Sequence, residues 1–129
     1  MKKILLIVSI IIVIITSIDI FVNYDRICLD GFEGEILSIL CITDTEYSQE
    51  YTHSKFSKII TGMTSKKVLD ILGEPLARWI PHDKESRSEN NKYINYQYSQ
   101  SPGSTHYRLR QVRFRNDTVY KISACFWVD

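Results

Sequence analysis

An apolar run near the N-terminus limits how the rest of this chain can fold. Lys2 and Lys3 precede a stretch from Ile4 to Ile18 that contains only apolar residues and a few hydroxyl side chains. A small domain cannot bury such a helix on all sides, so the segment is typical of a membrane-spanning or export helix. Of the 129 residues, roughly a hundred are left for one folded domain.

Two interpretations of this run stay open, an uncleaved membrane anchor and a cleaved signal peptide. The segment from Thr16 to Phe21, at the end of the apolar run, is rich in β-branched and aromatic residues. Signal-peptide cleavage requires small residues at this place, so the composition favours the anchor. A helix from Ile4 to Val22 would be roughly 28 Å long, enough to cross a thin bilayer. The preceding lysines predict that the remaining chain lies outside the cytoplasm.

The cysteines allow two interpretations as well. In an oxidising compartment Cys28 and Cys41 could form a disulfide, leaving Cys125 unpaired. Alternatively, some or all three are small buried apolar residues. No small-residue lipobox precedes Cys28, so we do not expect a lipid-modified cysteine.

The sequence has no pattern typical of a catalytic or metal site. There is no CxxC motif, and none of the three histidines lies at metal-ligand spacing from another ligand. No nucleophile-elbow motif or phosphate-binding glycine loop is present. We therefore expect no enzyme activity, no cofactor, no small-molecule substrate and no metal. Nucleic acid is not an expected partner of an exported domain.

Two short helices with marked ends are predicted after residue 53. Ser54 is a plausible N-cap, and Gly62 lies just past the end of this first helix. Thr64 can cap the second helix, Gly73 ends it and Pro75 prevents its continuation. Each helix places its apolar side chains on one face.

Three segments of alternating pattern then predict strands, at residues 93–99, 106–115 and 118–128. The middle strand requires a bulge near Arg110 and Gln111, because its apolar residues otherwise fall on both faces. In the last strand the alternating residues are Tyr120, Ile122, Ala124, Phe126 and Val128.

These elements predict an α+β fold. Two short helices pack on one face of a three-stranded antiparallel sheet, and an N-terminal membrane or signal helix precedes them. The expected divisions are a signal anchor or signal peptide at 1–23, an unassigned membrane-proximal segment at 24–53, and the α+β domain at 54–129.

A motif in the helical region resembles a known family signature. Gly62-Met63-Thr64, Val68 and Leu72-Gly73-Glu74-Pro75 match the G-M-T-x(3)-V-x(3)-L-G-x-P core of the SmpA/OmlA family, which includes the BamE outer-membrane-assembly lipoproteins. The β-lactamase-inhibitor proteins share this fold unit, and the likeness covers roughly residues 54–129. The resemblance implies a non-catalytic protein-binding module in the bacterial envelope, with a role in envelope or outer-membrane protein assembly or maintenance. This chain lacks the family's lipidated cysteine.

One strand carries the candidate partner-binding residues. The predicted bulge would turn Arg108, Arg110, Arg113 and Arg115 to the solvent face, where Trp127 has the exposed parity as well. These five residues are the predicted surface for an envelope protein, and the alternative is an ordinary solvated sheet face.

The expected function is an envelope-exposed binding module held by the N-terminal helix in the bacterial inner membrane, with its domain in the periplasm. If the signal is cleaved, the domain would be secreted or periplasmic. The alternative function is an inhibitor or immunity-type protein that occludes a partner enzyme with the polar loop from Pro81 to Lys92.

Overall fold

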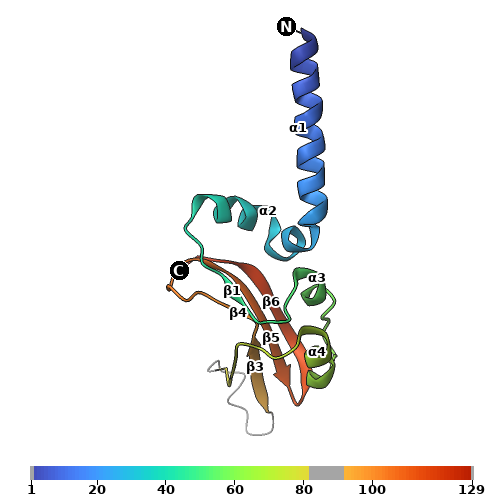
Figure 1. Ribbon diagram of the computed structural model, residues 1–129. Coiled ribbons are helices and arrows are strands. Elements are labelled where there is room, and N and C mark those ends of the chain that lie inside the picture. The colour runs from blue at the N-terminus through green and yellow to red at the C-terminus, as the bar shows by residue number, and fades with distance from the viewer. Residues whose placement is uncertain (1, 82–91, 129) are drawn as a thin grey trace.

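Within residues 2–81 and 92–128, which the computed structural model describes, helices precede and flank two antiparallel sheets (Figure 1). The larger sheet has the strand order β2-β3-β5-β6, and β1 pairs with β4 in the smaller one. In chain order the elements are α1 (Lys2–Val22), α2 (Tyr24–Leu40), β1 (Glu46–Tyr47), α3 (His53–Phe56), α4 (Ser65–Leu72), β2 (Ala77–Trp79), β3 (Tyr93–Gln97), β4 (Ser99–Gln100), β5 (Tyr107–Arg115) and β6 (Thr118–Trp127).

The predicted α+β class, with an N-terminal apolar helix and antiparallel strands, is confirmed. The prediction of three strands is wrong, because over the described residues the larger sheet has four. The additional edge strand β2 pairs Ala77 with Gln97 and Trp79 with Asn95. It is too short to show an alternating pattern, so the sequence gives no periodic signal for it.

Helices α3 and α4 cover one half of the sheet and enclose the apolar core. Thr52, not the predicted Ser54, caps α3 by accepting a hydrogen bond from the Lys55 amide at 3.1 Å. Thr64 caps α4, and Gly73 ends it with a φ of 73°. The buried core residues are Phe56, Ile59, Val68, Leu72, Tyr96, Tyr98, Val112, Phe114 and Val119.

The bulge in the β5–β6 pair does not lie where the sequence predicts it. Strand β5 passes Arg110 and Gln111 without a break, and the register shifts only between Arg113 and Phe114. Phe114 pairs with Val119 and Arg113 with Lys121, so the extra residue is Tyr120 on β6. The core therefore receives Val119, whereas unbroken alternation with Ile122 and Ala124 would place Tyr120 on that face.

The segment that the sequence left unassigned contains α2, which packs on β6. Gly31 divides α2 into two helical parts, since its φ of 72° and ψ of 169° are not helical. Gly34 is buried, and a Cβ there would lie 3.1 Å from the Cβ of Phe126. Figure 1 shows α1 projecting away from the domain, with α2 lying between the end of α1 and the sheet.

Two glycines with positive φ give a test of this packing. Alanine at Gly73 is strained by the backbone and would also bring its Cβ within 2.8 Å of the Glu50 Cβ, whereas at Gly62 (φ 90°) nothing lies within 4 Å. We expect Gly73→Ala to destabilise the fold by about 2–4 kcal/mol and Gly62→Ala by about 1–2 kcal/mol. Thermal unfolding of the full chain in detergent, followed by near-ultraviolet circular dichroism, measures the difference. Equal losses at the two positions would contradict the close contact at Glu50.

Candidate functional site

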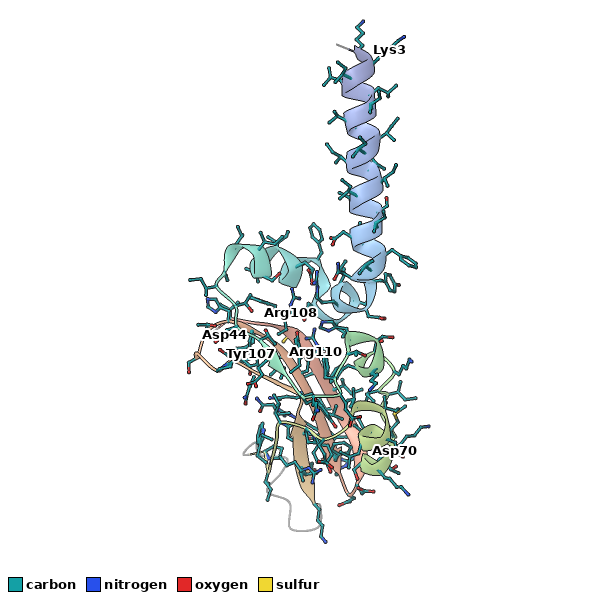
Figure 2. All side chains as sticks on the ribbon, in the orientation of Figure 1. Lys3, Asp44, Asp70, Tyr107, Arg108 and Arg110 are labelled. Atoms are coloured by element: carbon teal, nitrogen blue, oxygen red, sulfur yellow. The ribbon has the colours of Figure 1, made fainter. Side chains whose placement is uncertain are left out.

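The predicted arginine stripe is divided between the two faces of the sheet. Arg108 and Arg110 lie on the helix side, where their side chains are 11% and 0% exposed. The prediction that they face solvent is therefore wrong, and the cause is the misplaced bulge, since unbroken alternation along β5 puts both residues on the same face as Phe114. Arg113 faces the other side and Arg115 is exposed at the end of β5. Figure 2 shows Arg108 and Arg110 between α2 and the sheet.

Asp30 of α2 is the partner of both buried arginines. Its carboxylate is fully buried and accepts hydrogen bonds from Nη1 of Arg108 and, at 2.7 Å, from Nη1 of Arg110. Burial alone would lower the pKa of Arg110, but its hydrogen bond to Asp30 and the neighbouring negative charge outweigh that effect and raise the pKa. Arg110 thus remains charged inside the protein.

Glu35 adds a second carboxylate to this arrangement. It accepts a bidentate pair of bonds from Arg26, at 3.1 and 2.9 Å, and a further bond from Arg108 Nη1 at 2.8 Å. Because Arg26 precedes Gly31 and Glu35 follows it, these bonds hold the two parts of α2 at a fixed angle. We call the residues Arg26, Asp30, Glu35, Arg108 and Arg110 the Asp30 cluster.

A tyrosine and a histidine extend the Asp30 cluster toward α3. Arg110 Nε donates to the Tyr51 hydroxyl at 2.9 Å, and that hydroxyl lies 3.0 Å from His53 Nδ1. Tyr47 stacks on Tyr51 with ring centroids 4.5 Å apart. Burial, with the charge of Arg110 adding to it, lowers the pKa of His53 to about 4, and burial raises the pKa of Tyr51. His53 is therefore neutral at neutral pH. Because the Tyr51 hydroxyl accepts a hydrogen bond from Arg110, its own O–H is free to donate a hydrogen bond to His53 Nδ1.

The cysteines are free, so the Cys28–Cys41 disulfide, one of the two alternatives, is not formed, and Cys28 is exposed instead of buried. Cys28 lies in the first part of α2 and Cys41 follows its C-terminal end, so the helix holds the two residues apart. Cys125 is half-buried on β6, and burial raises the pKa of its thiol. In the described part of the chain no three histidine, cysteine or acidic side chains group in a way that could hold a metal ion.

The outer face of the sheet carries a pocket of about 370 Å³. Trp79 stands on the edge strand β2, while Trp127 projects from β6 and is 46% exposed. The Trp79 indole donates to the Gln97 side chain at 3.3 Å, which fixes the ring on the sheet. The residues that line this outer-face pocket are Trp79, Tyr107, Leu109, Gln111, Arg113, Ser123, Cys125 and Trp127.

The outer-face pocket contains two of the five predicted partner-binding residues, Arg113 and Trp127. Arg115 is not among its lining residues, and its guanidinium lies 5.9 Å from the Tyr120 ring centroid instead. The sequence analysis missed Tyr107 and Leu109, although simple alternation along β5 without a bulge would have placed both there. The alternative site in the loop from Pro81 to Lys92 falls on residues 82–91, which lie outside the described residues.

Comparison of the chain with protein-family models, curated proteins and solved structures gave no match. The resemblance to the SmpA/OmlA family therefore stays a prediction that rests on the motif at residues 62–75.

The low pKa of His53 predicts how stability depends on pH. The pKa of His53 is about 4 in the folded protein, against an ordinary value of 6.5. As the pH falls, His53 therefore takes up a proton in the unfolded chain before it does so in the folded protein. Stability should therefore fall as the pH drops from about 6.5 to about 4, by about 1–2 kcal/mol for this half-buried residue. His53→Asn retains an acceptor for Tyr51 but cannot titrate in this range, so its profile should be flatter. Denaturant titrations at several pH values measure both profiles, and parallel curves would contradict the assignment.

Proposed function

We propose that this chain is a non-catalytic binding module of the bacterial cell envelope. Helix α1 tethers it to the inner membrane, and the outer-face pocket binds a partner protein. The observation that carries the proposal is an aromatic pocket on an otherwise regular sheet face, with Trp127 left 46% exposed at its margin. The motif resemblance to envelope proteins points to the same class of role.

The tether rests on the length and composition of α1. The helix has 21 residues with a mean hydropathy of 3.0 over its most apolar window, and none of it is buried by the rest of the protein. It is long and apolar enough to cross a membrane, although a signal sequence would pass the same test. Lys2 and Lys3 at its start support an orientation with the domain in the periplasm.

The outer-face pocket has the features of a protein-binding surface. Exposed tryptophan and tyrosine side chains commonly provide most of the binding energy at protein interfaces, because they bury a large area at a low entropic cost. Its volume of about 370 Å³ is at the low end of the range for small-molecule pockets, so it suits one or two side chains of a partner. Arg113 and Gln111 would supply the polar contacts that fix the orientation of those side chains.

Strand β5 gives the pocket a rigid floor. Leu109 and Gln111 on β5 are each 8% exposed, and β5 is paired on both sides, to β3 and to β6. A surface of this kind needs little reorganisation on binding, which reduces the entropic cost of association.

Substitutions in and beside the pocket test the proposal. We expect Trp127→Ala and Arg113→Ala each to weaken capture of the partner from detergent-solubilised envelopes by about tenfold or more, as for central interface residues. Arg115→Ala and Lys121→Ala, at exposed positions that do not line the pocket, are the matched controls and should leave capture unchanged. Quantitative mass spectrometry of the captured proteins provides the measurement, and near-ultraviolet circular dichroism checks folding.

Capture that is equal for all four variants would contradict the outer-face pocket as the binding site. Recovery of the protein in the soluble fraction, without its first two dozen residues, would contradict the tether.

A further inference from the structure

The second part of α2 has an apolar side that the protein leaves uncovered. Phe32, Ile39 and Leu40 are 76%, 83% and 75% exposed, and Ile36 is 42% exposed. With 100° of rotation per residue, these four side chains fall within one face of the helix. We call them the apolar side of α2. A contiguous apolar surface of this kind on a folded domain indicates an interaction site.

The opposite side of the same helix is bound to the sheet. Gly34 packs against Phe126, and Glu35 and Ser38 accept hydrogen bonds from Arg108. These three residues of α2 therefore lie on its face toward β5 and β6. In the second part of α2 these polar and small residues therefore face the domain, while Phe32, Ile36, Ile39 and Leu40 face away from it. In a soluble domain the orientation of an amphipathic helix is the reverse.

The position of α2 relative to α1 identifies what covers the apolar side. Only Asn23 separates the two helices, and Gly31 then redirects the chain. Figure 1 shows the second part of α2 lying across the direction of α1, with α1 extending away on one side and the sheet on the other. Gly34, Glu35 and Ser38 face the sheet. The apolar side of α2 therefore points away from the sheet, in the direction in which α1 projects.

The end of α1 and the start of α2 also carry exposed apolar and aromatic side chains. Phe21 and Val22 are 84% and 72% exposed, and Tyr24 at the start of α2 is 62% exposed. Aromatic side chains at this level of a membrane helix are typical of the boundary between acyl chains and headgroups.

We propose that the second part of α2 is an in-plane interfacial helix, whose apolar side inserts into the surface of the same lipid bilayer that α1 crosses. This inference rests on the proposed tethering by α1 and adds a second contact with the membrane. Amphipathic helices bind to the interface in this way, with the apolar face in the headgroup and acyl boundary. The Asp30 cluster connects this helix to the sheet, so the bilayer would fix the orientation of the whole domain, including the outer-face pocket.

Site-directed spin labelling of the full chain tests the proposal. The three native cysteines are replaced by serine, and the chain is placed in nanodiscs of phosphatidylethanolamine and phosphatidylglycerol. A nitroxide is attached in turn at position 11 in α1, at 32 and 39 on the apolar side of α2, and at the control position 121 on the opposite face of the sheet. Collision rates with oxygen, which concentrates in the bilayer, and with a water-soluble nickel complex report the depth of each label.

We expect the ratio of oxygen to nickel collisions to be highest at position 11, intermediate at 32 and 39, and lowest at 121. The ratio at 32 and 39 should exceed that at 121 severalfold. A second comparison uses Glu33, exposed on the flank of the same helix, where the label should contact nickel more than at position 32.

Three results would overturn the inference or its basis. If position 11 lies in the bilayer while 32 and 39 match 121, α2 does not insert, and the tether by α1 still stands. If position 11 is also open to nickel, the proposed tether itself fails. If 32 and 39 are closed to both reagents and show dipolar broadening between labels, a second copy of the chain covers this surface instead of lipid.

Discussion

The buried carboxylate of Asp30 is the contact on which the position of the other functional elements depends. It lies between Arg108 and Arg110 with no exposed surface. A buried charge of this kind is tolerated only when it is paired and hydrogen-bonded, and removing one partner costs about 3–5 kcal/mol. The pairing therefore selects one placement of α2 on the sheet. That placement directs α1 away from the domain and leaves the apolar side of α2 uncovered.

Strand β5 serves two purposes because its alternation is unbroken. Arg108 and Arg110 face α2, while Tyr107 and Leu109 between and beside them line the outer-face pocket. The same strand therefore joins the membrane-proximal helix to the sheet and forms the floor of the proposed partner site. In this account the membrane-bound helix α2 and the partner protein contact opposite faces of one sheet.

Local signals account for what the sequence predicted correctly, and long-range contacts account for what it missed. The caps at Thr64 and Gly73 and the apolar run of α1 involve neighbours in the chain, so both were predictable. The bonds between Asp30 and the arginines join residues 78 and 80 positions apart, and no periodic pattern reports them. The bulge was misplaced because the prediction kept every apolar residue of this strand on the core side, and this error hid Tyr107 and Leu109 of the outer-face pocket.

A double-mutant cycle on Asp30 and Arg110 tests the central claim most directly. Denaturant unfolding of the full chain in detergent is measured for Asp30→Asn, Arg110→Met and the double variant. The account predicts that each single change costs about 3–5 kcal/mol and that the double variant loses less than the sum by about 2 kcal/mol or more. The exposed pair Glu74 and Arg78 is the control and should show near-additive effects. Additive losses at Asp30 and Arg110, no larger than those of the control, would contradict the account.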